Sequence, residues 1–108
     1  IRIAAAADGY ALDLSLTQTL PPILHGSGGL SAKSLEAGNA SYYYSQVQQR
    51  AAGSVQIGGE TIAVTGKAWK DHEYSTSVLS QGAIGWDWLS LQFDDGTALM
   101  LVVDDSVA

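Results

Sequence analysis

Residues 86–103 read WDWLSLQFDDGTALMLVV, and this stretch contains the clearest structural signal in the chain. Two segments rich in aromatic and aliphatic residues, Trp86–Phe93 and Thr97–Val103, flank the polar sequence Asp94-Asp95-Gly96. An Asp-Gly pair between two such segments favours the tight turn of a β-hairpin, because both residues tolerate the positive φ that the turn requires. We therefore predict a hairpin with Asp95-Gly96 at its tip.

A two-residue turn at this tip fixes which residues of the two strands face each other. The expected pairs are Phe93 with Ala98, Leu91 with Met100, and Leu89 with Val102. Strand alternation puts a second set on the opposite side of the hairpin: Trp86, Trp88, Ser90 and Gln92, across from Leu99 and Leu101. Indoles mixed with hydroxyl and amide groups suit either a ligand-facing surface or a rim half-covered by another strand or domain.

Strand signals continue toward the N-terminus. Apolar and polar residues alternate from Tyr10 to Leu16, as in a strand with one buried face. Gly58-Gly59 is a second hairpin signal, and it places Val55 near Ile62 on one apolar face. The other strand candidates are Ser41–Gln46, Ser54–Ile57 and Glu60–Ala68.

The segment Leu20–Asn39 is rich in Gly, Ser and Pro. We interpret it as a long connection, in which Ala32–Ala37 has room for one helical turn at most. The spacing of the candidates predicts an all-β fold of about 6–8 strands with little or no helix. An antiparallel meander of this kind either curls into a barrel or forms half of a sandwich.

The composition excludes several classes of function. The 108 residues correspond to one domain. Eleven acidic against 5 basic residues give a net charge of −6, which disfavours nucleic-acid binding. The chain has no cysteine, so disulfides, thiolate zinc sites and cysteine nucleophiles are excluded. No apolar run approaches the ~20 residues of a membrane-spanning helix, and we expect a soluble protein, with secreted and periplasmic locations left open.

The densest group of reactive side chains is Trp69-Lys70-Asp71-His72-Glu73-Tyr74, directly after the candidate strand Glu60–Ala68. If that strand continues, His72 has the parity of the apolar residues Ile62, Val64 and Ala68, and it points inward. Asp71 and Glu73 then share the opposite face with Trp69. A β-bulge after Gly66 would exchange the two faces and turn a carboxylate inward instead.

These side chains are compatible with proton transfer and also with a purely structural role. An inward histidine suits proton transfer because its ordinary pKa of about 6.5 lies near neutral pH; the alternative is a neutral imidazole hydrogen-bonded in the core. A buried carboxyl can act as a general acid, whereas an exposed Asp71–Glu73 edge would only discourage strand aggregation. Neither a metal nor a cofactor is predicted, since His25 and His72 each lack a second histidine at metal-ligand spacing.

Several segments in order along the chain carry a family resemblance. They are Leu24-His25-Gly26 with Gly29, Ala40–Ser45, Val64–Trp69, Asp71–Glu73, and Gly85–Gln92 with Asp94–Gly96. Together they resemble the AttH-like family, which is grouped with the carotenoid 1,2-hydratases (hydroxyneurosporene synthases). The D-H-E and G-W-D-W motifs are the most specific. The chain departs from the family pattern at Tyr74, where a tryptophan is expected, at Lys70, where an apolar residue is expected, and in its last residues, Val102–Ala108.

The resemblance implies a lipocalin-like β fold, an antiparallel barrel or half-sandwich, and a hydrophobic small-molecule ligand such as an isoprenoid or a polyene. Family members usually have two lipocalin-like domains, and residues 1–108 resemble only the first. The chain is therefore expected to be a single lipocalin-like domain: a fragment, a half that needs a second such domain or another copy of itself, or a single-domain variant.

The resemblance also implies two activities, hydration of a C=C bond by a hydratase (a hydro-lyase) and cyclisation by pericyclase-like relatives. For hydration, the candidate acid is Asp71 or Glu73, with His72 orienting it or holding water. The expected ligand-binding residues are Tyr43, Trp69, Tyr74, Trp86 and Trp88. The three tryptophans and Tyr74 are expected to supply aromatic walls that stabilise a carbocation. Cyclisation needs only a shaped pocket. The alternative function is a non-catalytic small-molecule binding or domain-packing module.

Overall fold

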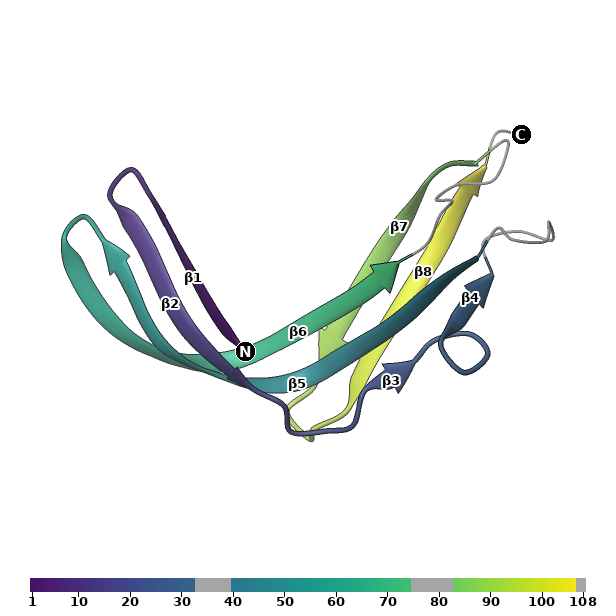
Figure 1. Ribbon diagram of the computed structural model, residues 1–108, viewed down its shortest axis with the longest axis horizontal. Helices are drawn as coiled ribbons and strands as arrows, with labels where there is room; N and C mark the ends of the chain where they lie inside the picture. Colours follow the sequence, from purple (N-terminus) through teal and green to yellow (C-terminus); the bar gives the residue numbers. More distant parts are fainter. Residues whose placement is uncertain (33–39, 75–82, 107–108) are drawn as a thin grey trace.

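The structure is a computed structural model that describes residues 1–32, 40–74 and 83–106. Every regular element in these ranges is a β-strand (Figure 1). The strands are β1 (Arg2–Ala7), β2 (Tyr10–Thr17), β3 (Ile23–Leu24), β4 (Leu30–Ala32), β5 (Ala40–Ile57), β6 (Glu60–Tyr74), β7 (Ala83–Gln92) and β8 (Ala98–Ser106). All strand pairs are antiparallel, which confirms the all-β prediction. Among the described residues no helix is long and apolar enough to cross a membrane.

The long strand β5 is the centre of the larger sheet. β2 pairs with its C-terminal half, β3 and β4 pair with its N-terminal half, and β6 follows it along both. β5 and β6 bend together and form the two arms of an open V (Figure 1). Their turn is Gly58-Gly59, with φ of 58° and 88°. Val55 pairs with Ile62 as predicted.

Two sequence expectations about this sheet need correction. The candidates Ser41–Gln46 and Ser54–Ile57 are parts of one strand, β5. The expected connection Leu20–Asn39 contains β3 and β4, because its backbone bonds along the edge of β5. His25 N donates to Tyr43 O, for example, at 3.0 Å. The helical turn considered for Ala32–Ala37 falls on residues outside the described part of the chain.

A β-bulge interrupts β5 at Gln48. The register with β6 shifts between Gln46 and Gln49, and Gln48 has a φ of 54°, an uncommon conformation for a residue with a side chain. Because the extra residue is in β5 alone, β5 side chains change face relative to β6 at this point. Ser45 lies opposite Asp71, whereas beyond the bulge Ala51 lies opposite Gly66, which has the other parity on β6.

Gln48 also attaches the β7–β8 hairpin to the sheet. Its backbone N donates to Gln92 Oε1 at 2.6 Å. Its side-chain Nε2 donates to Phe93 O at 3.0 Å and to Thr97 O at 2.7 Å. Thr19 Oγ1 donates to Gln48 O at 2.7 Å. The bulge therefore fixes the loop end of the hairpin against the middle of β5.

The register of the β7–β8 hairpin differs by one residue from the predicted one. Gln92 pairs with Ala98, Leu91 with Leu99, Ser90 with Met100, and Leu89 with Leu101. The predicted pairs Phe93–Ala98, Leu91–Met100 and Leu89–Val102 are wrong because the loop has three residues, Asp94–Gly96, with Phe93 N donating to Thr97 O at 2.9 Å. Gly96 takes the left-handed conformation that such a loop requires, with a φ of 90°.

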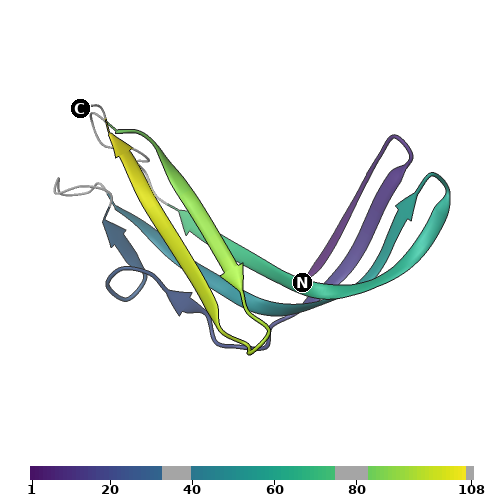
Figure 2. The same cartoon turned by 180° about the vertical axis from the view of Figure 1, so that it is seen from behind.

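The corrected register changes the composition of the polar-aromatic face of the hairpin. Trp88 and Ser90 share their face with Val102 and Met100 rather than with Leu99 and Leu101. This face is turned toward β5 and β6, since Gln92 bonds Gln48. Figure 2 shows the hairpin lying across the arm of β5 and β6 opposite to β1 and β2.

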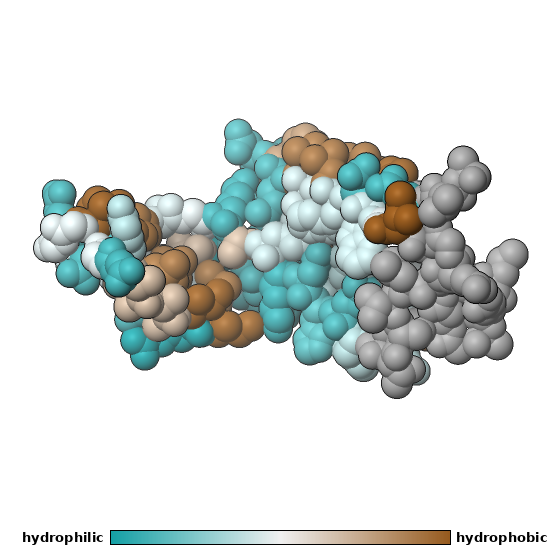
Figure 3. All heavy atoms as spheres, turned by 90° about the horizontal axis from the view of Figure 1, so that it is seen from above, coloured by the Kyte–Doolittle hydropathy of each residue, from teal (hydrophilic) through white to brown (hydrophobic). Residues whose placement is uncertain are grey.

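The other arm presents an apolar sheet face that the described residues leave largely uncovered. Paired residues of neighbouring strands point to the same side, and this apolar face consists of Ile3, Leu12, Leu14, Leu16, Val55, Ile62 and Val64. Hydrophobic residues are visible over this arm in Figure 3. The radius of gyration is 17.4 Å, against ~13 Å for a compact domain of about this length. The open shape explains why Ile3 and Ile62 stay 44% and 41% exposed.

Candidate functional site

The end of β6 distributes the predicted catalytic residues over two faces of the sheet. Asp71 and Glu73 lie on the face that the β7–β8 hairpin covers, together with Trp69. His72 lies on the opposite face, where it is exposed and stacks on Tyr44 with ring centroids 5.1 Å apart. The predicted parity of His72 is therefore right, but its predicted inward orientation is wrong. The hairpin packs on the other side of β6.

The alternative prediction of a bulge after Gly66 is also wrong in its position. β6 pairs regularly on both sides of Gly66, and the bulge lies in β5 at Gln48. A carboxylate nevertheless faces the hairpin, because the hairpin itself determines which side of β6 is covered. The structure does not bring His72 together with Asp71.

Asp71 is the centre of a polar cluster. Its Oδ1 accepts hydrogen bonds from Ser45 Oγ at 2.5 Å and from Trp69 Nε1 at 2.6 Å. Its Oδ2 accepts from Tyr43 OH at 2.8 Å. All three neighbours donate, which is the arrangement that an ionised carboxylate needs. Asp71 itself stays exposed, so the carboxylate is both firmly held and accessible.

His25 joins this cluster from a distant part of the sequence. Its Nε2 lies 2.7 Å from Ser45 Oγ, and its ring lies 4.3 Å from the ring of Tyr43. The backbone around it is fixed, because His25 N donates to Tyr43 O and Gly29 N donates to His25 O, each at 3.0 Å. We call the residues His25, Tyr43, Ser45, Trp69 and Asp71 the Asp71 cluster. The sequence did not predict that His25 lies at this site, and the one signal for its position was the family motif Leu24-His25-Gly26.

Tyr43 is the buried phenol of the cluster, with 8% of its surface exposed. Its hydroxyl also lies 3.3 Å from Met100 Sδ, so β8 reaches the cluster. Burial raises the pKa of Tyr43 to about 12, and the hydrogen bond to Asp71 acts in the same direction, while a hydrogen bond with the Trp88 side chain acts against it. Tyr43 is therefore a neutral hydrogen-bond donor at ordinary pH.

The remaining predicted residues divide between the two faces. Glu73 Oε1 accepts a hydrogen bond at 2.5 Å from Ser41 Oγ, a buried hydroxyl on the cluster side. Trp69 meets Trp88 edge to face, with centroids 6.1 Å apart. Trp86 has the parity of Trp88, and the two side chains are 48% and 43% exposed. Tyr74 stacks on Tyr42 at 5.3 Å on the His72 side. Among the predicted ligand-binding residues, Tyr43, Trp69 and Trp88 gather near Asp71, whereas Tyr74 does not.

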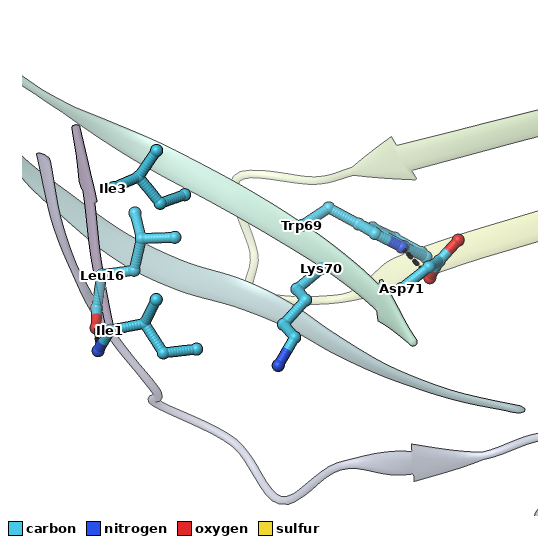
Figure 4. A pocket seen from close by; sticks show the side chains of 6 residues that line it. All are labelled: Ile1, Ile3, Leu16, Trp69, Lys70 and Asp71. Carbon is cyan, nitrogen blue, oxygen red and sulfur yellow. Dashed lines mark hydrogen bonds between the residues drawn. The ribbon is translucent and has the colours of Figure 1, made fainter. Parts of the chain in front are cut away.

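An open depression lies between the apolar face and residues 69–71 of β6. It has a volume of about 400 Å³ and is lined by Ile1, Ile3, Leu16, Trp69, Lys70 and Asp71. In Figure 4 the three aliphatic side chains lie on one side of it, and the hydrogen-bonded pair Trp69–Asp71 lies on the other. Within the described residues, no group of three His, Cys, Asp or Glu side chains is close enough to hold a metal ion.

Fold and site together define an antiparallel β-sheet protein in which an aromatic hairpin packs on the sheet face that carries a hydrogen-bonded carboxylate. The chain belongs to the AttH-like family, whose family model matches residues 1–103, as the sequence motifs predicted. Its structure is similar to the crystal structure of a candidate AttH from Nitrosomonas europaea, with a TM-score of 0.91 and 41% identity over 97% of this chain. The chain spans 32% of that protein's length. No curated protein matches it.

Proposed function

We propose that this domain binds a hydrophobic isoprenoid or polyene. The observation that carries the proposal is the depression of about 400 Å³ beside the apolar face, which is lined by three aliphatic residues and by residues 69–71 of β6. Small-molecule sites are typically apolar concavities with a few convergent polar groups. An elongated apolar ligand lying on the apolar face would end beside Lys70, which has the same parity on β6 as Ile62 and Val64.

The open sheet fits a role as part of a larger binding unit. In this proposal β1–β8 form part of a lipocalin-like barrel, which a second lipocalin-like domain or another copy of the chain completes. Closure would cover Ile3, Ile62 and the rest of the apolar face, which are exposed here. Burying apolar surface contributes ~25 cal/mol per Å², so an uncovered face of this size favours a partner or a ligand.

Binding is tested by titrating the full-length protein with all-trans-retinol and following quenching of tryptophan fluorescence. Saturable quenching is expected, and Ile3→Gln should weaken it about tenfold by placing an amide in the apolar wall. Val103→Gln is the matched control, because Val103 is 60% exposed on the outer face of the hairpin. Absence of saturable quenching, or equal affinities of the two variants, would refute the proposal.

The aromatic surroundings of Asp71 favour a second candidate function, acid-assisted hydration of a C=C bond. In its protonated form Asp71 would transfer the proton to one carbon of the double bond. Water would add to the resulting tertiary carbocation and release a proton to Asp71 or to solvent. The rings of Tyr43, Trp69 and Trp88 are placed to stabilise positive charge beside it. Glu73 is the alternative acid on the same face, while His72 lies on the other side of the sheet.

Hydration is distinguished from cyclisation and from binding alone by Asp71→Asn. For a hydratase this variant loses turnover but keeps retinol affinity within about threefold, since the amide retains the shape of the carboxylate. Glu73→Gln gives the same comparison for the second carboxylate. A cyclase that acts by holding its substrate folded would keep its turnover in both variants.

A further inference from the structure

We infer that His25 controls the protonation of Asp71 through the hydroxyl of Ser45, which makes His25 a positioning residue for proton transfer at this site. The inference rests on the proposed role of Asp71 as an acid. Two contacts in sequence carry it: His25 Nε2 to Ser45 Oγ at 2.7 Å, and Ser45 Oγ to Asp71 Oδ1 at 2.5 Å.

Because Ser45 is buried, its hydroxyl is not solvated and connects His25 to Asp71. Ser45 is 0% exposed. A serine hydroxyl has one proton to donate and accepts through its lone pairs. Because Ser45 donates to Asp71, it accepts from His25, so the Nε2 atom of His25 carries a proton in this arrangement. The chain of donors therefore runs in one direction, from His25 to the exposed carboxylate.

Proton transfer along this chain conserves protons and charge and needs no further reactant. The Nε2–H bond of the His25 imidazolium breaks as its proton moves to Ser45 Oγ, and the original Ser45 proton moves to Asp71 Oδ1. The products are a neutral imidazole, an intact serine hydroxyl and a neutral carboxylic acid. In a hydration, Asp71 gives one proton to the substrate and the attacking water releases one. When Asp71 does not take up the proton from water, a new proton enters at His25 instead.

Two other titratable side chains, Tyr43 and Glu73, lie beside the relay. Tyr43 contacts both ends of the relay, with its ring on His25 and its hydroxyl on Asp71, but its pKa of about 12 keeps it neutral. Glu73 follows Asp71 on the same face of β6 and accepts from Ser41. From β7 and β8, the described side chains that reach the cluster are Trp88 and Met100, which do not titrate.

The relay is tested in the full-length protein by NMR, following the carboxyl carbon of Asp71 and the ring of His25 against pH. In the wild-type protein, the Asp71 signal should show an inflection at the pH where His25 titrates. His25→Gln keeps an N–H donor near the Nε2 position but has no charge to lose, and it should abolish the inflection. Ser45→Ala should uncouple the two signals while His25 still titrates.

His72→Gln is the matched control, since His72 lies on the opposite face, and it should leave the Asp71 inflection in place. If Ser45→Ala does not fold, His25→Gln still decides the question. Persistence of the inflection in His25→Gln, or its loss in His72→Gln, would overturn the relay. Retinol titrations of the same variants report on ligand binding separately, so a failure of the proposed function is distinguishable from a failure of the relay.

Discussion

Ser45 and Asp71 lie directly opposite each other on β5 and β6, with Ser45 Oγ 2.5 Å from Asp71 Oδ1. This pairing depends on the bulge at Gln48, because strand pairing carried without a bulge from Ala51–Gly66 would give Ser45 a different partner on β6. The site is therefore a consequence of one irregularity in a long strand. Substitutions at the bulge should therefore alter both the attachment of the hairpin and the geometry of the Asp71 cluster.

The first prediction concerns the side chain of Gln48. Gln48→Ala removes the two hydrogen bonds that Nε2 donates to Phe93 O and Thr97 O. At ~1 kcal/mol for each bond, we expect a loss of about 2 kcal/mol in the free energy of unfolding. Gln56→Ala, on an exposed position of the same strand, should change it by less than about 0.5 kcal/mol. Urea unfolding measures both, and equal values would contradict this role of Gln48.

The second prediction concerns the close approach of β2 to β5 at Gly53. A Cβ atom at Gly53 would lie 2.0 Å from the carbonyl oxygen of Asp13, so Gly53→Ala must push the two backbones apart. We expect a destabilisation of about 2 kcal/mol or more. A Cβ at Gly66 on the neighbouring strand meets no atom within 4 Å, and Gly66→Ala should be neutral or slightly stabilising. Thermal unfolding of the two variants tests the contrast.

The third prediction follows from the raised pKa of Tyr43. The folded state holds the neutral phenol up to about pH 12, whereas the unfolded chain releases the proton near pH 10. The unfolded state thus binds fewer protons between these values, and stability falls as pH rises through this window. Below pH 10 the contribution of Tyr43 is fully present.

Ultraviolet absorbance of tyrosinate should resolve Tyr43 as the last tyrosine to titrate while the protein stays folded. Tyr43→Phe should remove that late phase and flatten the alkaline loss of stability. Tyr10→Phe, at a position that is 64% exposed, should leave both unchanged. Titration of Tyr43 together with the exposed tyrosines would contradict its burial and its hydrogen bond to Asp71.

Local sequence signals predicted the parts of the fold that depend on neighbouring residues. The Gly58-Gly59 turn and the shared face of Trp69, Asp71 and Glu73 follow from turn chemistry and strand alternation. The choice of the covered face did not follow, because it depends on where β7 and β8 pack. For the same reason the sequence could not show that His72 is exposed.

Two features of the site could not be predicted from neighbouring residues in the sequence. Gln48 adopts a positive φ although glutamine has no preference for it, and its four hydrogen bonds to other segments compensate for that conformation. His25 is distant from Asp71 in the sequence, and the pairing of β3 with β5 brings it to Ser45. Long-range strand pairing therefore assembles the Asp71 cluster, which the spacing of residues along the chain could not predict.

The last prediction separates the observed register of the β7–β8 hairpin from the one expected for a two-residue turn. Leu91 pairs with Leu99, and directly opposite Cα atoms in an antiparallel pair are ~4.5–5.5 Å apart, within the range of a disulfide. Since the chain has no native cysteine, Leu91→Cys with Leu99→Cys should oxidise to an internal disulfide, detected as a loss of free thiols in the monomer. Leu91→Cys with Met100→Cys places the two sulfur atoms on opposite faces of the hairpin and should keep both thiols free. The reverse result would restore the two-residue turn and would move Met100 away from Tyr43, because Met100 reaches the hydroxyl of Tyr43 only when it shares the face of Trp88 and Ser90.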